Sequence, residues 1–215
     1  RAMTGPIVVI NPNSNQAVTD GLAEALAPFA AGIRIDCVTL TEGPFGIESQ
    51  RDVDQVALPL AALIEARADA AAFVIACYSD PGIDLCRETA RVPVFGIQES
   101  GVLTALARGD RVGVFAIAEA SIRRHRRYLR RMGVEHRLAG ERALNMSVDE
   151  SARGEGTLAR LTEVGHELIA DGADVLLLGC AGMARHRRPL QASLGRPVID
   201  PTQAAVAMAI GAVLA

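Results

Sequence analysis

The sequence predicts an α/β protein with two pseudo-symmetric lobes, each a mainly parallel sheet flanked by helices, and an active site in the cleft between them. Short apolar β-branched runs alternate with longer amphipathic stretches along all 215 residues, as expected when helices connect and cover parallel strands. Several runs are apolar at every position, which burial on both faces of a sheet requires. The third observation is an internal repeat, in which both halves read strand, cysteine, small turn, helix and short strand after proline.

Seven apolar runs are the predicted strands. In chain order they read IVVI (7–10), IRIDCVTL (33–40), AAFVIA (71–76), PVFGI (93–97), RVGVFAI (111–117), ADVLLLG (173–179) and PVID (197–200). The stretches between them have helical periodicity. In the first of these stretches, for example, Leu22, Leu26 and Phe29 fall on one stripe. This alternation favours a parallel sheet with helices on both faces.

The internal repeat places a cysteine at the same point of each half. Cys77 ends the run VIAC before the turn YSDPG, and Cys180 ends the run VLLLGC before the turn AGM. A Pro-Val strand follows each cysteine at a similar distance. The general similarity of all βαβ units is the alternative explanation, but a duplication accounts better for cysteines at matching strand ends.

The repeat also sets the expected domain boundaries. Lobe 1 is predicted over residues 1–97, with the C-terminal segment 201–215 packing back on it, and lobe 2 over residues 98–200. Open α/β sheets bind ligands outside the carboxyl ends of their strands, and binding sites often lie between lobes. Because both repeated cysteines lie at such ends, lobes that face each other would bring two thiols to one small ligand from opposite sides.

Composition and charge exclude several classes of function. Half of the residues are apolar and 22% are charged, which is typical of a packed globular protein and too hydrophobic for disorder. Aromatic residues make up 3% and the net charge is −3, so neither base stacking nor overall attraction to nucleic acid is expected. No apolar run approaches a membrane span and the N-terminal stretch lacks a signal-peptide pattern. We expect a soluble cytoplasmic protein without a nucleic-acid or membrane partner.

The most basic stretch, IRRHRRYLRRM (122–132), is interpreted as an amphipathic helix. Its apolar face is formed by Ile122, His125, Leu129 and Met132. The arginines are then expected on the solvated face, which argues against a nucleic-acid surface. The four histidines have no metal-ligand spacing and the four cysteines form no C-x-x-C pair. With no phosphate-binding or dinucleotide-binding glycine motif either, we expect neither a metal nor a cofactor.

Two of the four cysteines are candidates for chemistry. Asp80 and the proline after it are predicted to be the N-cap and first residue of a helix shortly after Cys77, and a bare small-residue turn follows Cys180. The helix dipole and free backbone N–H groups are expected to favour a thiolate at both positions. The alternative for each is a buried packing role, which we assign to Cys86 on a helical core stripe and to Cys37 within a strand.

The stretch INPNSN (10–15) gathers polar side chains at the carboxyl end of the first strand. Its donors and acceptors are Asn11, Asn13, Ser14 and Asn15. A turn with an N-cap is the alternative, since these residue types favour turns. More donors are present than a cap needs, so we expect this loop to contact a neutral or anionic polar ligand.

With these residues in place, the chain resembles the aspartate/glutamate racemase superfamily, and most closely its hydantoin and allantoin racemase branch. The similar stretches run nearly end to end and read INPNSN, CYSDPG, PVFGIQES (93–100), LLLGCAGM and RPVID. The resemblance implies a cofactor-independent racemase of 5-substituted hydantoins or related, allantoin-like cyclic ureides. It also implies proton transfer between two bases, no metal, and a homo-oligomer.

The resemblance assigns roles to individual residues. Cys77 and Cys180 match the two catalytic cysteines. The positions that match substrate-binding segments are Asn11, Asn13, Ser79, Ala181 and Gly182. Gly182 stands where the amino-acid racemases of the superfamily carry histidine, and this departure fits the hydantoin branch better.

Other functions remain open at this point. Asn15 stands where the hydantoin branch often has Ser or Thr and where maleate isomerase relatives carry Asn. A maleate-type cis-trans isomerase, in which one thiolate adds to a double bond, or another Asp/Glu racemase-type enzyme is therefore the enzymatic alternative. A two-lobed sensor that binds a small ureide is the non-enzymatic one. The arylmalonate decarboxylase branch keeps only the second cysteine, so the presence of both favours racemisation over decarboxylation.

Overall fold

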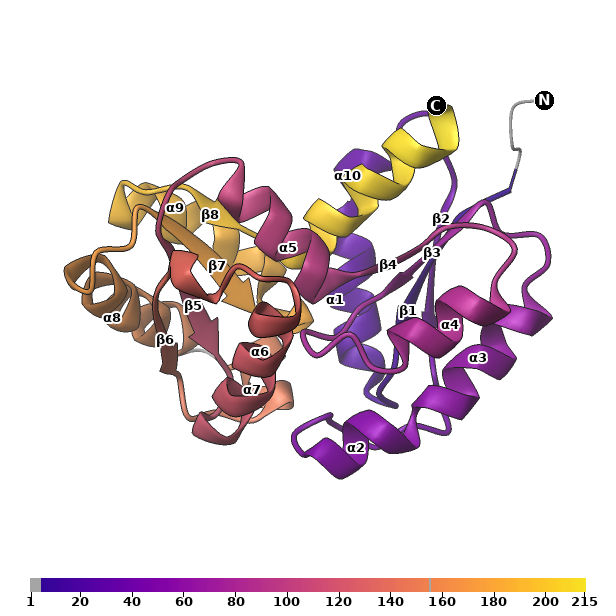
Figure 1. Ribbon diagram of the computed structural model, residues 1–215, viewed down its shortest axis with the longest axis horizontal. Coiled ribbons are helices and arrows are strands. Elements are labelled where there is room, and N and C mark those ends of the chain that lie inside the picture. Colours follow the sequence, from indigo (N-terminus) through magenta and orange to yellow (C-terminus); the bar gives the residue numbers. More distant parts are fainter. Residues whose placement is uncertain (1–4, 155) are drawn as a thin grey trace.

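The computed structural model describes residues 5–154 and 156–215, so the first four residues of the predicted lobe 1 lie outside the described part. Two four-stranded parallel sheets lie side by side (Figure 1). The first, of order β2-β1-β3-β4, contains β1 (Ile7–Asn11), β2 (Ile35–Thr39), β3 (Ala72–Ile75) and β4 (Val94–Gly96). The second, of order β6-β5-β7-β8, contains β5 (Val112–Ala116), β6 (Leu138–Ala143), β7 (Val175–Gly179) and β8 (Val198–Ile199). The repeated strand order confirms the predicted two-lobed parallel α/β fold.

Helices cover the sheets (Figure 1). The first half contributes α1 (Gln16–Leu26), the 3-10 helix η1 (Ala27–Phe29), α2 (Gln50–Gln55), α3 (Ala57–Ala66), α4 (Ile83–Thr89) and α5 (Ile97–Leu106). The second half contributes α6 (Glu119–Arg131), η2 (Glu135–Arg137), α7 (Val148–Arg153), α8 (Thr157–Ala170), η3 (Ala181–His186), α9 (Arg187–Leu194) and α10 (Pro201–Leu214). The inner strands β1, β3, β5 and β7 are buried at every residue, as their unbroken apolar runs predict.

One strand was not predicted from the sequence. β6 reads LAGERA, with charged residues among small ones, and most of its residues are only partly buried. It lies at the edge of the second sheet and pairs with β5 alone. An edge strand has one neighbour and less apolar contact, so it needs no continuous apolar run. The other edge strands, β2, β4 and β8, do contain apolar runs that predict them, whereas β6 has none.

The last helix of each half lies at the junction between the sheets. α10 packs against α5 and against β3 and β4 of the first sheet, whereas α5 also packs against β7 of the second. Gly101 of α5 lies so near this junction that a Cβ atom there would be 2.9 Å from both Leu177 and Pro201. Each half therefore contributes a helix to the sheet of the other, and the two halves are held together by these exchanged helices.

The hydrophobic core consists of two clusters of buried side chains. The larger one runs through both halves and includes Phe115, Leu161 and Leu176, and the smaller one lies in the first half. Cys86 is fully buried in the smaller cluster, and Cys37 is partly buried against the larger one. The packing role predicted for both cysteines is confirmed.

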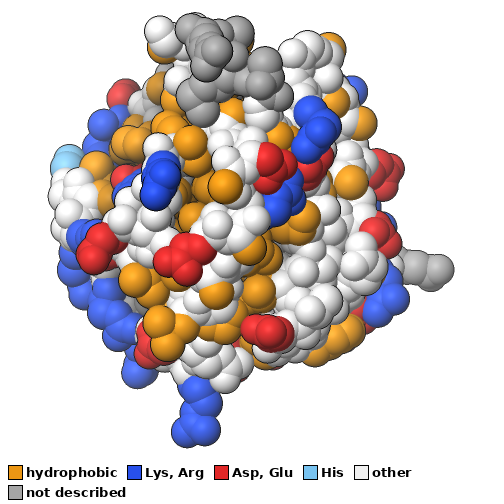
Figure 2. Space-filling model, turned by 90° about the vertical axis from the view of Figure 1, so that its right-hand side faces the viewer, with side chains coloured by type: hydrophobic (Ala, Val, Ile, Leu, Met, Phe, Trp, Pro, Cys, Tyr) orange, Lys and Arg blue, Asp and Glu red, His pale blue; other side chains and the backbone are white. Residues whose placement is uncertain are grey.

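The surface carries charges of both signs. On the face shown in Figure 2, apolar side chains lie between acidic and basic ones, and the basic side chains gather along one edge. The predicted amphipathic helix is α6, whose His125 and Leu129 are buried and whose arginines are exposed apart from the partly buried Arg124. Within the described ranges, no helix combines the length and the hydropathy that crossing a membrane would need.

Candidate active site

The two repeated cysteines line one cavity between the halves of the molecule. Cys77 lies just beyond the end of β3 and Cys180 directly follows β7. The cavity is also lined by Asn13, Ser79 and Ala181. Its volume is about 40 Å³, which accommodates water but not a five-membered ring with substituents. The structure thus brings five of the seven predicted site residues to one narrow cavity.

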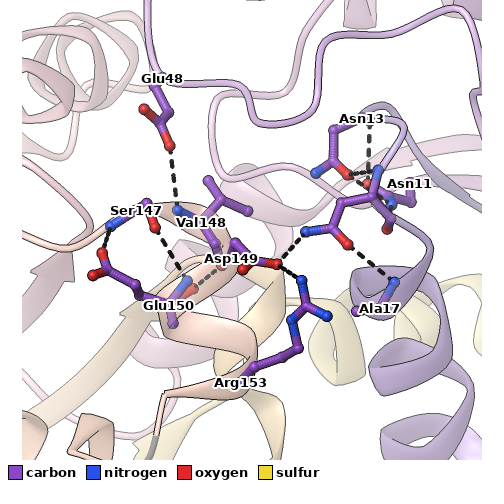
Figure 3. A network of polar contacts seen from close by, with 11 residues as sticks. Asn11, Asn13, Ala17, Glu48, Ser147, Val148, Asp149, Glu150 and Arg153 are labelled. Carbon is purple, nitrogen blue, oxygen red and sulfur yellow. Dashed lines mark hydrogen bonds and ion pairs between the residues drawn. The ribbon is translucent and has the colours of Figure 1, made fainter.

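Asn11 does not line this cavity and instead holds the loop that does. Its side chain is buried, and its Nδ2 donates to Asn13 Oδ1 at 3.0 Å and to the Asn15 carbonyl at 3.1 Å (Figure 3). Its Oδ1 accepts the Asn13 N–H at 3.2 Å. Asn13 Oδ1 also accepts the Asn15 N–H at 3.0 Å, so the side-chain NH2 group is the part of Asn13, a residue of the cavity lining, that remains for a ligand. Asn11 is therefore a positioning residue for Asn13.

Asp80 does not cap the helix that follows it, so this prediction is wrong. α4 begins at Ile83, and Asp80 itself has a left-handed backbone with φ 42°. Its buried carboxylate accepts the N–H groups of Gln98 and Glu99 at 2.8 and 2.9 Å, at the start of α5. A Cβ atom at Gly96 would lie 2.2 Å from the Asp80 carboxyl carbon. The carboxylate reaches α5 because the left-handed turn redirects it and Gly96 leaves room.

Burial dominates the ionisation of Cys77. Together with the nearby Cys180 and Asp80, it raises the pKa of the Cys77 thiol to about 12. The Ser79 N–H and the Arg124 guanidinium act in the opposite direction. The helix after Cys77 begins only at Ile83, so its dipole does not act at the sulfur as expected. Desolvation outweighs the turn donors at this sulfur, and a thiolate in the presence of a substrate stays a prediction.

The pKa of Cys180 is also set by burial against nearby hydrogen-bonding groups, which differ from those at Cys77. Burial raises the pKa of its thiol, whereas the Gly182 N–H and the contact with the Ser151 hydroxyl lower it. The Ser151 Oγ lies 3.6 Å from the Cys180 sulfur. Gly182 therefore contacts the sulfur through its backbone, although it does not line the cavity. A side chain there would approach Ser151 and Ala152, because an added Cβ would lie 3.3 Å from each.

Contacts between the halves position the helix that carries Ser151. Asn15 Nδ2 donates to Asp149 Oδ1 at 2.8 Å, and the Val148 N–H donates to Glu48 Oε1 at 3.3 Å (Figure 3). Both contacts join loops of the first half to the start of α7. The contacts that join the two halves therefore also hold the helix that places Ser151 beside Cys180.

α6 contributes three cavity residues that sequence reasoning missed. They are Ser121, Arg124 and His125. His125 is buried on the predicted stripe, but its Nδ1 lies 2.5 Å from Glu141 Oε1 and its ring meets Tyr78 edge-on at 4.9 Å. In the sequence, the only sign of this polar contact was a histidine at a position of the apolar stripe. Its partner could not be predicted, because Glu141 lies on the edge strand that the apolar runs do not reveal.

Two buried aspartates are expected to make the stability fall as the pH rises. Burial raises the pKa of Asp80 and of Asp200 from 3.8 to about 7. The folded protein then keeps protons that the unfolded chain has released, so this stabilisation is complete below pH 3.8 and is lost as the pH rises to about 7. We expect the free energy of unfolding, measured with urea, to fall between about pH 4.5 and about pH 7.5. His186 opposes this trend weakly, because burial lowers its pKa.

The variant Asp80→Asn should reduce the slope of this pH dependence by roughly half, because one of two such groups is removed. Asp54→Asn, at an exposed position of α2, should leave the slope as in the unmodified protein. An unfolding free energy that rises with pH across this range would contradict the burial of both carboxyl groups.

Comparison with known proteins places this geometry in a family. Residues 7–209 match the family described as Asp/Glu/hydantoin racemase. A hydantoin racemase of Paenarthrobacter aurescens is 35% identical over 94% of this chain and 89% of its own. Two solved structures are also similar across both halves. The allantoin racemase from Klebsiella pneumoniae has a TM-score of 0.94 and 30% identity, over 98% of this chain and 88% of that one.

The second structure is the allantoin racemase from Pseudomonas fluorescens, with a TM-score of 0.90 and 27% identity over 97% of this chain and 91% of that one. The similarity therefore includes both sheets and both strand ends that carry the cavity cysteines. By its sequence and by its fold, the chain belongs to the Asp/Glu/hydantoin racemase family and is an isomerase.

Proposed function

We propose that the protein is a cofactor-independent racemase of 5-substituted hydantoins or related cyclic ureides, with Cys77 and Cys180 as the two bases. The observation that carries the proposal is that two thiols from equivalent strand ends of the two halves line one cavity. The names of the hydantoin and allantoin racemases to which the chain is similar support the substrate class. A cytoplasmic location and a homo-oligomer stay predictions from the sequence.

The chemistry needs acid/base groups on both faces of one carbon. C5 of a hydantoin lies beside a carbonyl group, so loss of its proton gives a planar enolate. In one direction the thiolate of one cysteine takes the proton, and the thiol of the other donates its own proton to the opposite face. The two cysteines then have exchanged protonation states, and the reverse sequence converts the other enantiomer. A single cysteine could not serve both faces.

The cavity of about 40 Å³ must widen to admit the ring, and we propose that this widening also favours the thiolate. In the narrow cavity burial raises the pKa of both thiols, because a desolvated sulfur disfavours charge. A widened cavity admits water and a polar ring, which reduces this penalty. The N–H groups of Ser79 and Gly182, which act against the penalty at Cys77 and Cys180 respectively, then favour the thiolate that the reaction needs.

The remaining site residues have proposed roles in holding the ring. The Asn13 amide and the turns at Ser79 and Ala181, three residues of the cavity lining, are proposed to hold the carbonyl oxygens and ring nitrogens of the ureide. Donors at the enolate oxygen stabilise the charge that develops when the proton leaves C5. Asn11 supports this arrangement by fixing Asn13.

Hydrogen exchange at C5 tests the proposal. The protein is incubated in D2O with single enantiomers of 5-substituted hydantoins and of allantoin, and optical rotation and deuterium content are followed by polarimetry and NMR. We expect deuterium at C5 together with loss of rotation. Tight binding without exchange would indicate a sensor. Isomerisation of maleate without exchange of any ureide would indicate the cis-trans isomerase.

A further inference from the structure

A second hollow adjoins the cysteine cavity. It has a volume of about 230 Å³, and Ser79 and Arg124 belong to the walls of both spaces. Its other walls are Gln50, Val53, Gln98, Arg127, Tyr128 and Arg131. A substituent on a ring held between the cysteines would enter this hollow past Ser79 and Arg124. The hollow is lined by three arginines and two glutamines and has no acidic side chain.

Two of the three arginines have partners in the structure. Arg131 donates two hydrogen bonds to the Asp84 carboxylate, at 2.6 and 2.9 Å. Arg127 donates to Gln50 Oε1 at 3.1 Å. Both contacts join α6 to helices of the first half, so these two arginines help to close the hollow.

Arg124 is left without an acidic partner among the residues that the structure describes. Its NH1 and NH2 groups make only long contacts within α6, at 3.4 Å to the Ala120 carbonyl and 3.3 Å to the Ser121 hydroxyl. Its Nε is buried and has no hydrogen-bond partner. Asp52 acts on it only at longer range. A partly buried guanidinium with an unused donor gains most from an anion that can accept two hydrogen bonds from it.

We propose that Arg124 binds a carboxylate on the C5 substituent, so that the preferred substrates are hydantoins with a carboxyalkyl group. The inference rests on the proposed function, because the ring must lie between the cysteines for its substituent to reach the second hollow. The planar guanidinium matches a carboxylate in a bidentate arrangement. A neutral apolar substituent would leave the buried Nε without a partner.

The competing role for Arg124 is an effect on Cys77 alone. The guanidinium lies near that thiol and favours its ionised form. If Arg124 acted only on Cys77, its substitution would lower kcat/KM by the same factor for every substrate. Substrates of equal shape and different charge therefore separate the two roles.

The test compares 5-(2-carboxyethyl)hydantoin with its carbamoyl counterpart, in which a neutral amide replaces the carboxylate. We expect kcat/KM of the unmodified protein to be about 10-fold to 100-fold higher for the carboxylate. In Arg124→Gln this ratio should fall to about one, and Arg124→Lys, which keeps the charge but loses the bidentate geometry, should give an intermediate ratio. Arg126→Gln removes the same charge from an exposed position of α6 and should keep the ratio of the unmodified protein. An equal loss for both substrates in Arg124→Gln would overturn the inference.

Calorimetric binding of the same two hydantoins separates this inference from the proposed function. Weaker binding of the carboxylate alone in Arg124→Gln supports the role of Arg124 whether or not C5 exchanges. Equal affinity of the unmodified protein for both hydantoins overturns the inference, even if both are racemised. Absence of exchange with every hydantoin overturns the proposed function, and the binding comparison still decides on Arg124. Absence of binding by both overturns the inference, and C5 exchange with other hydantoins and allantoin still decides on the proposed function.

Discussion

Cys77→Ser and Cys180→Ser are each expected to reduce racemisation by roughly 10³-fold or more, because a serine hydroxyl is too weak an acid to replace either thiol. The two thiols lie at equivalent strand ends on one cavity, so neither can reach both faces of C5. The measurement is the initial rate of optical rotation change with a single enantiomer of a 5-substituted hydantoin. Serine is close to cysteine in size, so the cavity should keep its shape.

The same variants should differ in proton exchange. Each variant keeps one of the two thiols. That thiol should still exchange the C5 proton of the enantiomer whose C5–H bond points towards it. NMR in D2O is expected to show slow exchange of opposite enantiomers in the two variants. Cys37→Ser, at a partly buried position of β2 that is not part of the cavity lining, serves as the control and should remain active. A fully active Cys77→Ser or Cys180→Ser protein would contradict the two-base mechanism.

Gly179→Ala is expected to destabilise the protein by about 3 kcal/mol, because the new methyl group has no space. A Cβ atom at Gly179 would lie 2.1 Å from the Phe115 carbonyl oxygen of the neighbouring strand β5. A backbone carbonyl in a paired strand cannot turn away, so β5 and β7 must move apart. Gly179 directly precedes Cys180 and lines the cavity. We therefore expect kcat to fall together with the free energy of unfolding measured with urea.

Gly211→Ala is the matched control. Its Cβ atom would have open space around it on α10, and alanine should stabilise the helix by up to about 1 kcal/mol. If Gly179→Ala were as stable as Gly211→Ala, the close approach of β5 and β7 at the active site would be wrong.

The sequence determined the parts of this protein that depend on local pattern. Unbroken apolar runs predict the inner strands because burial on both faces leaves no place for polar side chains. The repeat of strand, cysteine and turn predicted two equivalent halves and placed Cys77 and Cys180 at strand ends. In a parallel sheet the carboxyl ends of the strands lie on the same side of the sheet. The sequence therefore also predicted on which side of each sheet the site lies.

The edge strand β6 and the polar partners required the tertiary structure. Asp80 has the sequence of a local cap, yet its carboxylate binds the start of α5, eighteen positions further along the chain. β6 supplies Glu141 for His125 although its own pattern predicts no strand. A carboxylate binds whichever donors the fold brings within reach, and that choice is not encoded in the residues beside it.

The ionisation of the thiols and the role of α6 were also decided by the tertiary structure. The local turns after Cys77 and Cys180 favour a thiolate, but burial by both halves raises the pKa of each sulfur. Arg124 is one of several arginines on a basic helix, and only the packing of α6 over the cleft turns it towards the cavity. Hydrophobic periodicity shows on which face of its own helix a residue lies. Desolvation and pairing depend on what the other half of the molecule places opposite that face, and only the tertiary structure contains that information.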